Sequence, residues 1–353
     1  MFLTKLLLEN FRSHQKTLFE FDPKVNLILG PNGSGKTNIL ESIYLLSHGK
    51  SFRSSSLQKL IMWNSSYASI RGKLSINDEL LELEIQLTND PKKTAITRRL
   101  LINKVEKLRK DFLGQIKTVI FHPDDIRLVA GSPGRRRDFL DEIFTQSEWR
   151  YSSALSQYNR ALKHRNELLD LIKVGKNTKT ELYYWDQSLI KNDNIIHEFR
   201  LSFIKHLNGF LQNHPDPEIN TLSINYYPSF FTQEKTDQNY LRELECGYTQ
   251  SGLHRDDFSF DNSIFESVDK NLASWGSRGQ QRLATFAVRL GQIDYLEKKY
   301  RESPILLLDD IFSELDENHQ KLVSKICHKY QTIFTSSEPE SSSILPLAKV
   351  IQL

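Results

Sequence analysis

The residues best suited to chemistry in this chain form one short glycine-rich segment, which reads Gly30-Pro31-Asn32-Gly33-Ser34-Gly35-Lys36-Thr37. Its glycines, lysine and threonine match the phosphate-binding loop pattern at each fixed position. Glycines allow backbone N–H groups to turn toward a phosphate, and the positive end of a following helix adds to the attraction. We therefore expect Lys36 to reach the β and γ phosphates of a nucleotide and the Thr37 hydroxyl to hold Mg²⁺. Ser34 is expected to be backbone scaffolding, because no partner base is evident.

A second segment, far along the chain, supplies the acidic partner that such a loop needs. Four consecutive apolar residues beginning at Ile305 predict a buried strand that leads into Asp309 and Asp310. A carboxylate at the end of such a strand is typical of the second Mg²⁺ contact in nucleotide-hydrolysing proteins. The glycine-rich segment itself follows the apolar run Val25–Leu29 and precedes the helical pattern Ile39–Leu46, which is the context that the motif requires. The two segments together predict that the protein binds ATP with Mg²⁺.

Composition excludes several other classes of protein. The chain has 353 residues, of which 26% are charged and 39% hydrophobic, as in ordinary globular proteins. Its net charge of +3 says little about nucleic acid, so a DNA surface must come from local patches. Cys246 and Cys327 show neither metal-ligand spacing nor a disulfide framework, which favours a reducing, cytoplasmic location. No apolar run is long enough to predict a membrane span, and no histidine spacing indicates a zinc hydrolase.

The elements that must position these residues change in character along the chain. Short strands are expected at 2–10, 18–21 and 25–29, ahead of the glycine-rich loop. Alternating apolar residues at 67–76 and 80–87 predict a hairpin around Asn77-Asp78, and a further stretch at 97–105 turns at Asn103-Lys104. We expect these strands to form an antiparallel layer beside the nucleotide core.

Helical periodicity takes over after the turn signals at 131–134. Apolar residues at helical spacing occupy 155–172 and 182–210, with a polar break at 175–180 between them. This pattern predicts two antiparallel helices that form an arm, and Arg165 interrupts the first apolar stripe. We therefore expect a discontinuous head made of residues 1–130 and 246–353, with residues 131–245 as a helical arm domain.

The C-terminal third carries a second candidate phosphate-binding segment. Ser277, Gly279 and Gln280 precede a strong helical pattern, and by themselves they are as well explained as a helix cap. The acidic strand and then Ser313-Glu-Leu-Asp316 follow them in the chain. This order of segments resembles the ABC-type ATPases. In that family, the segment with Ser277, Gly279 and Gln280 would be the signature motif, and Asp316 would belong to the D-loop.

This resemblance implies a fold and a mechanism. The fold class would be α/β, an ABC-type P-loop ATPase head with a mixed central sheet and an antiparallel β layer, plus the helical arm. Ser277, Gly279 and Gln280 would act in trans on ATP bound by the partner's loop, which makes an ATP-dependent homodimer, and Asp316 would link the two sites. Asp310 occupies the catalytic position that usually polarises the attacking water. Because most ABC heads have Glu there, we expect slow hydrolysis, below the median enzyme turnover of about 10 s⁻¹.

Four further blocks narrow the resemblance to one family. They are the opening Leu7–Ser13, the long block Phe121–Asp141, the Gly-Leu-His-Arg-Asp-Asp segment Gly252–Asp257, and Gly276–Arg282. Together they closely resemble the DNA-associated RecF family over essentially the whole chain. The chain departs from the family at Leu253, where proline is usual, and at His122, where serine is common. Thr335 or Ser336 stands where transporters place a γ-phosphate-sensing histidine, and a hydroxyl cannot carry imidazolium charge.

Membership of this family would imply ATP-dependent binding to DNA where single-stranded gaps meet duplex, with no covalent chemistry on DNA. It would also imply partnership with RecR and RecO in loading RecA on gaps coated with single-strand-binding protein, in recombinational repair and replication restart. Candidate DNA phosphate contacts are Arg135, Arg136 and Arg137, with a second cluster at Lys104, Lys107, Arg109 and Lys110. Each cluster is equally well explained as a solvated or ion-paired surface.

Some alternatives stay open at this point. Arg12 either reaches bound nucleotide or caps the first sheet. The competing functions are an ABC transporter motor subunit or another SMC-like ATPase. The long interval between Thr37 and Ser277, which contains the arm, disfavours the transporter subunit. A related P-loop nuclease would need an acidic domain after the ATPase, and few residues follow Asp316.

Overall fold

The structure of the protein is a computed structural model of residues 1–353, and it describes all of them except residues 78, 91, 93–94, 266–268, 313–316 and 339–346. The chain divides into two compact units. Unit 1 consists of Met1–Asp125 and Gln292–Leu353, and unit 2 consists of Ile126–Gly291. Unit 2 therefore includes residues 246–291, which the sequence analysis assigned to the head.

Unit 1 contains an antiparallel sheet whose six strands are arranged in the order β2-β1-β4-β5-β6-β7. The strands are β1 (Phe2–Phe11), β2 (His14–Glu20), β4 (Tyr67–Ile76), β5 (Glu79–Thr88), β6 (Thr97–Ile102) and β7 (Val105–Glu106). The expected hairpin and the turn at 103–104 are confirmed, while β2 begins earlier than expected. Asn103 and Lys104 both have positive φ, 49° and 66°, as a two-residue hairpin turn with right-handed strand twist requires.

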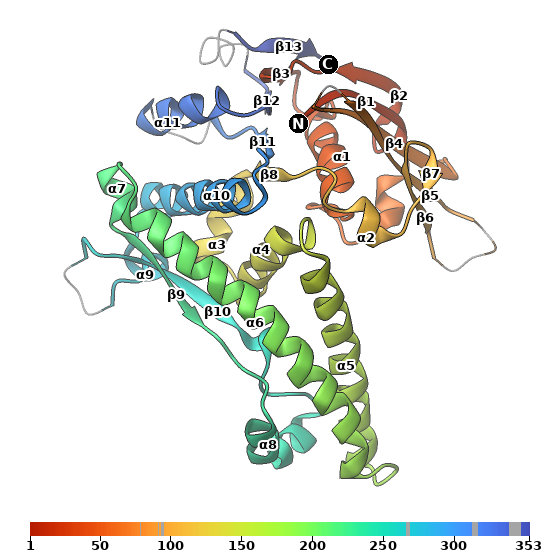
Figure 1. The fold of residues 1–353 in the computed structure, drawn as a ribbon, viewed down its shortest axis with the longest axis vertical. Helices are drawn as coiled ribbons and strands as arrows, with labels where there is room; N and C mark the ends of the chain where they lie inside the picture. Colours follow the sequence, from red (N-terminus) through yellow and green to blue (C-terminus); the bar gives the residue numbers. More distant parts are fainter. Residues whose placement is uncertain (78, 91, 93–94, 266–268, 313–316, 339–346) are drawn as a thin grey trace. The chain divides into compact units, whose positions relative to one another are not determined.

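A second sheet of unit 1 holds the nucleotide motifs. Its five strands are all parallel and lie in the order β13-β3-β12-β11-β8. They are β3 (Val25–Leu29), β8 (Thr118–Phe121), β11 (Ile305–Asp309), β12 (Thr332–Ser336) and β13 (Lys349–Gln352). Strands β11 and β12 are buried throughout, which is why both read as continuous apolar runs. Parallel strands end at the same edge of a sheet, so the loop after β3 and the acid at the end of β11 meet there (Figure 1).

Helix α1 (Lys36–His48) packs between the two sheets of unit 1 (Figure 1). Its apolar side chains join residues of both sheets in one core, to which Leu6, Ile43 and Leu307 all belong. The helix ends at Gly49, whose positive φ of 66° allows its N–H to donate to the carbonyl of Leu45 at 2.8 Å. Unit 1 also contains η1 (Leu57–Leu60), α2 (Arg109–Phe112) and α11 (Glu317–Cys327), while η2 (Pro123–Ile126) spans the boundary between the units.

Unit 2 is dominated by two long helices, α5 (Trp149–Lys173) and α6 (Leu182–Gln212), which lie side by side as the predicted arm (Figure 1). Helix α8 (Gln233–Cys246) packs against both of them. The antiparallel pair β9 (Leu222–Tyr227) and β10 (Asp257–Asn262) completes the unit with shorter helices. These are α3 (Arg127–Ala130), α4 (Pro133–Thr145), α7 (Pro217–Asn220), α9 (Leu272–Trp275), η3 (Lys179–Glu181) and η4 (Leu253–Arg255); α10 (Arg278–Tyr300) begins in unit 2 and ends in unit 1.

The arginine that interrupts the apolar stripe of the arm has a structural explanation. Arg165 is fully buried, and its Nε lies 2.6 Å from Asp186 Oδ1 on α6. Its Nη2 lies 2.7 Å from Glu243 Oε2 on α8, and Nη1 donates to Thr249 Oγ1 at 2.8 Å. The charge therefore connects three helices, because a buried guanidinium needs several fixed acceptors.

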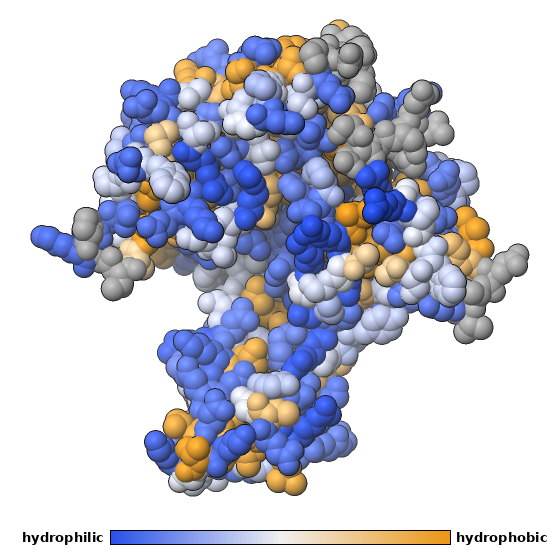
Figure 2. Space-filling model, turned by 180° about the vertical axis from the view of Figure 1, so that it is seen from behind, coloured by the Kyte–Doolittle hydropathy of each residue, from blue (hydrophilic) through white to orange (hydrophobic). Residues whose placement is uncertain are grey.

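The surface of the protein is mainly polar on the face drawn in Figure 2, where hydrophobic residues form small separate groups. Some of the exposed hydrophobic residues of unit 2 lie near the α5–α6 turn and on α8, among them Val174 and Leu241. Among the helices that the structure describes, none has both the length and the apolar character needed to cross a bilayer.

Candidate nucleotide site

The glycine-rich loop has the backbone shape that phosphate binding needs. Gly33 and Gly35 have φ values of 84° and 101°, a region that residues with a Cβ rarely adopt. A Cβ on Gly35 would lie 2.7 Å from Ser13 Oγ, so a larger residue would also displace that side chain. The loop leads directly into α1, whose first residues are Lys36 and Thr37, and Pro31 and Asn32 are exposed at its tip.

Lys36 lies across the loop with its ammonium group held by backbone oxygens. Its side chain is 7% exposed, and Nζ donates to the carbonyls of Gly30 at 2.6 Å and Pro31 at 3.0 Å. No carboxylate of the described residues pairs with this charge. Ser34 Oγ is buried in the same loop without a hydrogen-bond partner among the described residues. A phosphate would satisfy both groups, so the loop fits a nucleotide.

The carboxylate of Asp309 is contacted by side chains from several elements of the site. Its Oδ1 accepts hydrogen bonds from Thr37 Oγ1 at 2.9 Å and from Thr335 Oγ1 at 3.0 Å. Strand order explains the contact, because β12 lies between β3 and β11 and carries Thr335 to the same edge. A hydroxyl beside a carboxylate is a set of hard oxygens suited to Mg²⁺. The two predicted metal ligands, Thr37 and Asp309, are thus brought together, and Thr335 rather than Ser336 occupies the hydroxyl position beside them.

His122, which the sequence analysis treated only as a departure from a family pattern, also reaches this carboxylate. Its Nε2 lies 3.4 Å from Asp309 Oδ2. Its Nδ1 accepts the backbone N–H of Asp124 at 3.1 Å, so the neutral ring carries its proton on Nε2, toward the acid. The ring also packs edge-on against Phe52. The position of His122 directly after an apolar strand was the signal that could have revealed this role.

Asp310, the candidate catalytic residue, has an unusual backbone. Its φ is 50°, and its N–H donates to Thr335 Oγ1 at 3.0 Å. A positive φ in a residue other than glycine is strained and is held only where the surroundings demand it. Thr335 therefore contacts both residues, because its hydroxyl donates to the Asp309 carboxylate and accepts the backbone N–H of Asp310.

Arg12 is held by a buried carboxylate on α1. Its Nε donates to Glu41 Oε2 at 2.8 Å and its Nη2 to Glu41 Oε1 at 2.6 Å, while Nη1 donates to the carbonyl of Lys59 at 2.9 Å. Glu41 is fully buried on α1, so this fork joins the β1–β2 turn to the helix.

The signature residues form the start of α10. The N–H of Ser277 donates to Gln280 Oε1 at 2.9 Å, and the N–H of Gln280 donates to Ser277 Oγ at 3.3 Å. This reciprocal pair is a capping box, and Ser277 and Gly279 are exposed. The cap satisfies two N–H groups at the start of a long helix, whose positive end favours an anion. The D-loop candidate Asp316 lies outside the described residues.

The three consecutive arginines of α4 have different surroundings. Arg135 is exposed, whereas Arg136 is buried and donates through Nε and Nη2 to Asp257 at 2.6 and 3.0 Å. Arg137 Nη1 donates to the carbonyl of Asp256 at 2.9 Å. Two of the candidate DNA contacts therefore hold the block 252–257, and Arg135 is left exposed.

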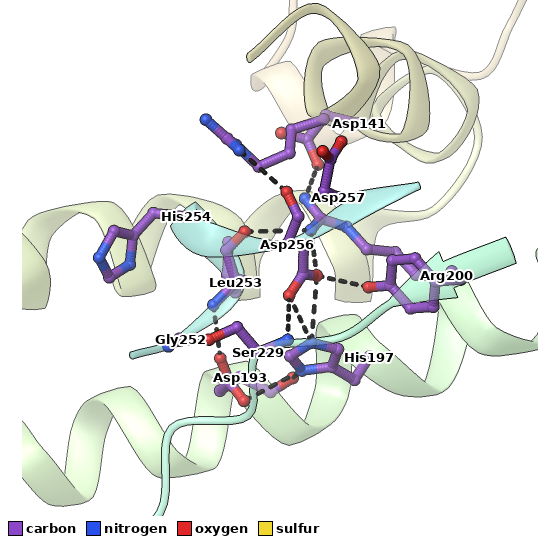
Figure 3. A network of polar contacts seen from close by, with 12 residues as sticks. Asp141, Asp193, His197, Arg200, Ser229, Gly252, Leu253, His254, Asp256 and Asp257 are labelled. Atoms are coloured by element: carbon purple, nitrogen blue, oxygen red, sulfur yellow. Dashed lines mark hydrogen bonds and ion pairs between the residues drawn. The ribbon is translucent and has the colours of Figure 1, made fainter. Parts of the chain in front are cut away.

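A buried polar network lies behind that block (Figure 3). Asp256 contacts His197 Nε2 at 3.1 Å and Arg200 Nη1 at 2.7 Å, and it accepts the Tyr226 hydroxyl. His197 Nδ1 lies 3.0 Å from Asp193 Oδ2 on its other side. Burial lowers the pKa of His197, but its hydrogen bonds to the two carboxylates and their charges outweigh burial and raise this pKa to about 9. This network was not predicted from the sequence, although residues 193, 197 and 200 are all buried on α6.

Leu253 and Gly252 show why this block has its residue types. The N–H of Leu253 donates to Asp193 Oδ1 at 3.0 Å, a bond that proline could not make. Leucine at this position therefore adds a contact to the network. Gly252 has a φ of 118°, and a Cβ there would lie 2.2 Å from the hydroxyl of Tyr158.

Comparison with known proteins places the chain among relatives. The family model described as the RecF/RecN/SMC N-terminal domain matches residues 2–342. The "DNA replication and repair protein RecF" of Leptospira interrogans serovar Lai is 34% identical over 349 residues, which cover 96% of this chain and 93% of the relative. The protein of the same description from Clostridioides difficile is 34% identical, covering 98% of this chain and 94% of its own.

Solved structures give the same result. A structure described as the recombination mediator protein RecF-ATPrS in the RecFOR pathway superimposes with a TM-score of 0.86 and 29% identity, covering all of this chain and 96% of the other. A RecF-ATP structure has a TM-score of 0.83 and 30% identity, covering 96% and 92%. An SMC head bound to ScpA, 17% identical with a TM-score of 0.54, shares the fold over 100% and 94% of the two chains.

These likenesses confirm the expected α/β ATPase-head fold and extend over both compact units. The transporter alternative has no support among them. The chain belongs to the RecF family.

Proposed function

We propose that the protein is an ATP-dependent DNA-binding protein of replication and recombinational repair. The observation that carries this proposal is the convergence of Thr37, Thr335 and Asp309 beside the glycine-rich loop. Its RecF relatives are described as DNA replication and repair proteins, and two similar structures as RecF with ATP or an ATP analogue. The same two structures are placed in the RecFOR pathway, so we propose DNA, RecO and RecR as partners and a cytoplasmic location.

In the proposed complex, ATP lies against the loop 30–37. The Lys36 ammonium exchanges its carbonyl contacts for phosphate oxygens, and the Ser34 hydroxyl gains the partner that it lacks. Thr37 and Asp309 would hold Mg²⁺, which supplies positive charge to the β and γ phosphates. Phosphate oxygens of the nucleotide would supply further ligands to this ion.

ATP would act as a switch through a homodimer. Ser277, Gly279 and Gln280 of one protomer contact the γ phosphate held by the other, and Asp316 links the two sites. ATP favours the closed dimer only because the dimer offers it this second set of contacts. The functional division would be a head of residues 1–130 and 246–353 and an arm of residues 131–245. Asp310 would polarise the attacking water slowly, so the closed state is long-lived and its turnover stays below about 10 s⁻¹.

The test is fluorescence anisotropy of a gapped duplex titrated with the full chain, with and without ATP and Mg²⁺. We expect binding to require ATP and to be lost in Ser277→Arg, which keeps its own phosphate loop but cannot close on a partner. Ser274→Arg is the matched control, because Ser274 is also exposed and lies one turn earlier, at α9. Binding that is indifferent to ATP and to Ser277→Arg would contradict the proposal.

A further inference from the structure

Two arginines of unit 1 meet at the C-terminal end of α1. Arg98 on β6 donates from Nη1 to the carbonyl of Gly49, the cap of α1, at 2.5 Å. A Cβ placed on Gly49 would lie 3.9 Å from Arg98 Nη1 and 4.0 Å from Arg109 Nε on α2. Both guanidinium groups thus approach the same point from different elements. Figure 1 shows α1, β6 and α2 in this part of unit 1.

The two charges are not compensated by acids. Burial lowers the pKa of Arg98, and the charge of Arg109 lowers it further; burial also lowers the pKa of Arg109. Within the described part of the chain, no carboxylate lies within ion-pair distance of either guanidinium. Neighbouring cations differ, because Arg99 pairs with Glu106 at 3.0 Å and Lys117 with Glu302 at 2.5 Å.

The attraction of cations to a helix C-terminus explains the position of Arg98 but not that of Arg109. A helix C-terminus attracts cations, and one such contact is worth about 0.3–1 kcal/mol. Arg98 makes it through its hydrogen bond to Gly49. Arg109 makes no side-chain hydrogen bond to any described residue, although a guanidinium carries five N–H donors. Arg109 is exposed, so its free N–H donors are open to a ligand, and an anion placed here could contact both guanidinium groups.

More cations surround the pair on the same segments. Lys50 follows Gly49, and Lys107 and Lys110 flank Arg109; all three are exposed, and none is ion-paired to a described residue. The backbone N–H of Lys107 donates to the carbonyl of Leu100 at 2.8 Å, which holds this segment against β6. A single small anion needs only the two arginines. Several exposed cations next to the pair in the sequence suit a polymer that carries many phosphates.

We propose that Arg98 and Arg109 bind a backbone phosphate of DNA, with Lys50, Lys107 and Lys110 contacting adjacent phosphates. This inference rests on the proposed function and locates part of its DNA surface on unit 1. Phosphate contacts carry no base information, so the site is independent of sequence.

The experiment measures gapped-duplex affinity with ATP and Mg²⁺ over a series of salt concentrations. The main variant combines Arg109→Ala with Lys107→Ala. Neither side chain makes a hydrogen bond to a described residue, so we expect the double variant to fold. We expect weaker binding. The slope of log affinity against log salt concentration should become less steep by about 2, or about 1 for each phosphate contact removed. Arg99→Ala is the matched control, since Arg99 neighbours Arg98 on the strand and is paired with Glu106. It should leave affinity and slope unchanged.

Failure of this proposal is separable from failure of the proposed function. If the wild type binds DNA in an ATP-dependent way and the double variant keeps its affinity and slope, the site is wrong and the function stands. If the wild type does not bind DNA at all, both are wrong. A further experiment compares how much inorganic phosphate raises the melting temperature of the wild type and of the double variant. A shift that the double variant loses, with unchanged DNA binding, would assign the pair to a free anion and overturn the DNA site.

Discussion

Asp309 shows how one residue can organise a site through its two oxygen atoms. Thr37 and Thr335 both contact Oδ1, whereas His122 lies near Oδ2. Partners of a metal-ligating carboxylate fix its orientation and tune its affinity for the metal. The side chains around Asp309 therefore matter for chemistry even where they touch no nucleotide.

We expect Thr335→Val to lower ATP turnover by about 10–100-fold, the usual cost of losing such an orienting partner. Valine has nearly the same shape but cannot accept the Asp310 N–H or donate to Asp309. ATP affinity should change much less, because the loop and Lys36 remain. Steady-state kinetics and binding of a fluorescent ATP analogue separate the two effects.

Ser336→Ala is the control, because the Ser336 hydroxyl on the next position of the strand accepts the N–H of Glu338 instead. An equal loss in both variants, or a loss confined to ATP affinity, would contradict the role of Thr335.

At the scale of elements, buried ionic networks hold unit 2 together. Asp256 connects η4, α6 and β9 through His197, Arg200 and Tyr226, and Arg165 connects α5, α6 and α8. Removing one partner of such a network leaves an uncompensated buried charge, which costs about 3–5 kcal/mol. Burial also raises the pKa of Tyr226 and Tyr158, so both hydroxyls stay protonated in the ordinary pH range.

The raised pKa of His197 predicts a pH dependence of stability. Its folded pKa of about 9 exceeds its ordinary value of 6.5, so the folded state binds more protons between these values. The stabilisation is complete below pH 6.5 and is lost as the pH rises through 9, by about 3 kcal/mol. Urea unfolding followed by tryptophan fluorescence in a Trp63→Phe variant measures this loss of stability. The other tryptophans, Trp149, Trp185 and Trp275, all belong to unit 2.

His197→Gln in this background should remove most of the dependence between pH 6.5 and 9. His164→Gln is the control, because His164 lies on the same arm but is partly exposed and pairs with Glu167. A pH profile that is the same in all three proteins would show that His197 does not titrate as stated.

At the scale of the whole molecule, slow hydrolysis sets how long the proposed dimer lasts. We expect Asp310→Asn to bind ATP normally and to hydrolyse it more slowly, because an amide is a poor base. The dimer formed with ATP and Mg²⁺ should therefore persist longer, as followed by sedimentation or light scattering after ATP is depleted. Dimer decay as fast as that of the wild type, with hydrolysis abolished, would show that release does not depend on hydrolysis.

The sequence by itself determined the parts that depend on local pattern. The loop 30–37, the strand leading into Asp309 and the two arm helices were predictable, since turn chemistry and apolar periodicity act over a few residues. The ATPase-head fold and the family also followed, because several motifs occur in a specific order along the chain.

Tertiary structure decided which of several similar residues lies at the site and which partner each of them contacts. Sheet order selected Thr335 over Ser336 and brought His122 to Asp309. Packing assigned Arg136 to Asp257, and it left Arg109 beside Arg98 with no described carboxylate within ion-pair distance. The physical reason is that these contacts join residues far apart in sequence, and their geometry depends on strand order, register and burial together. Charge and motif alone cannot distinguish a buried ion pair from a free cation.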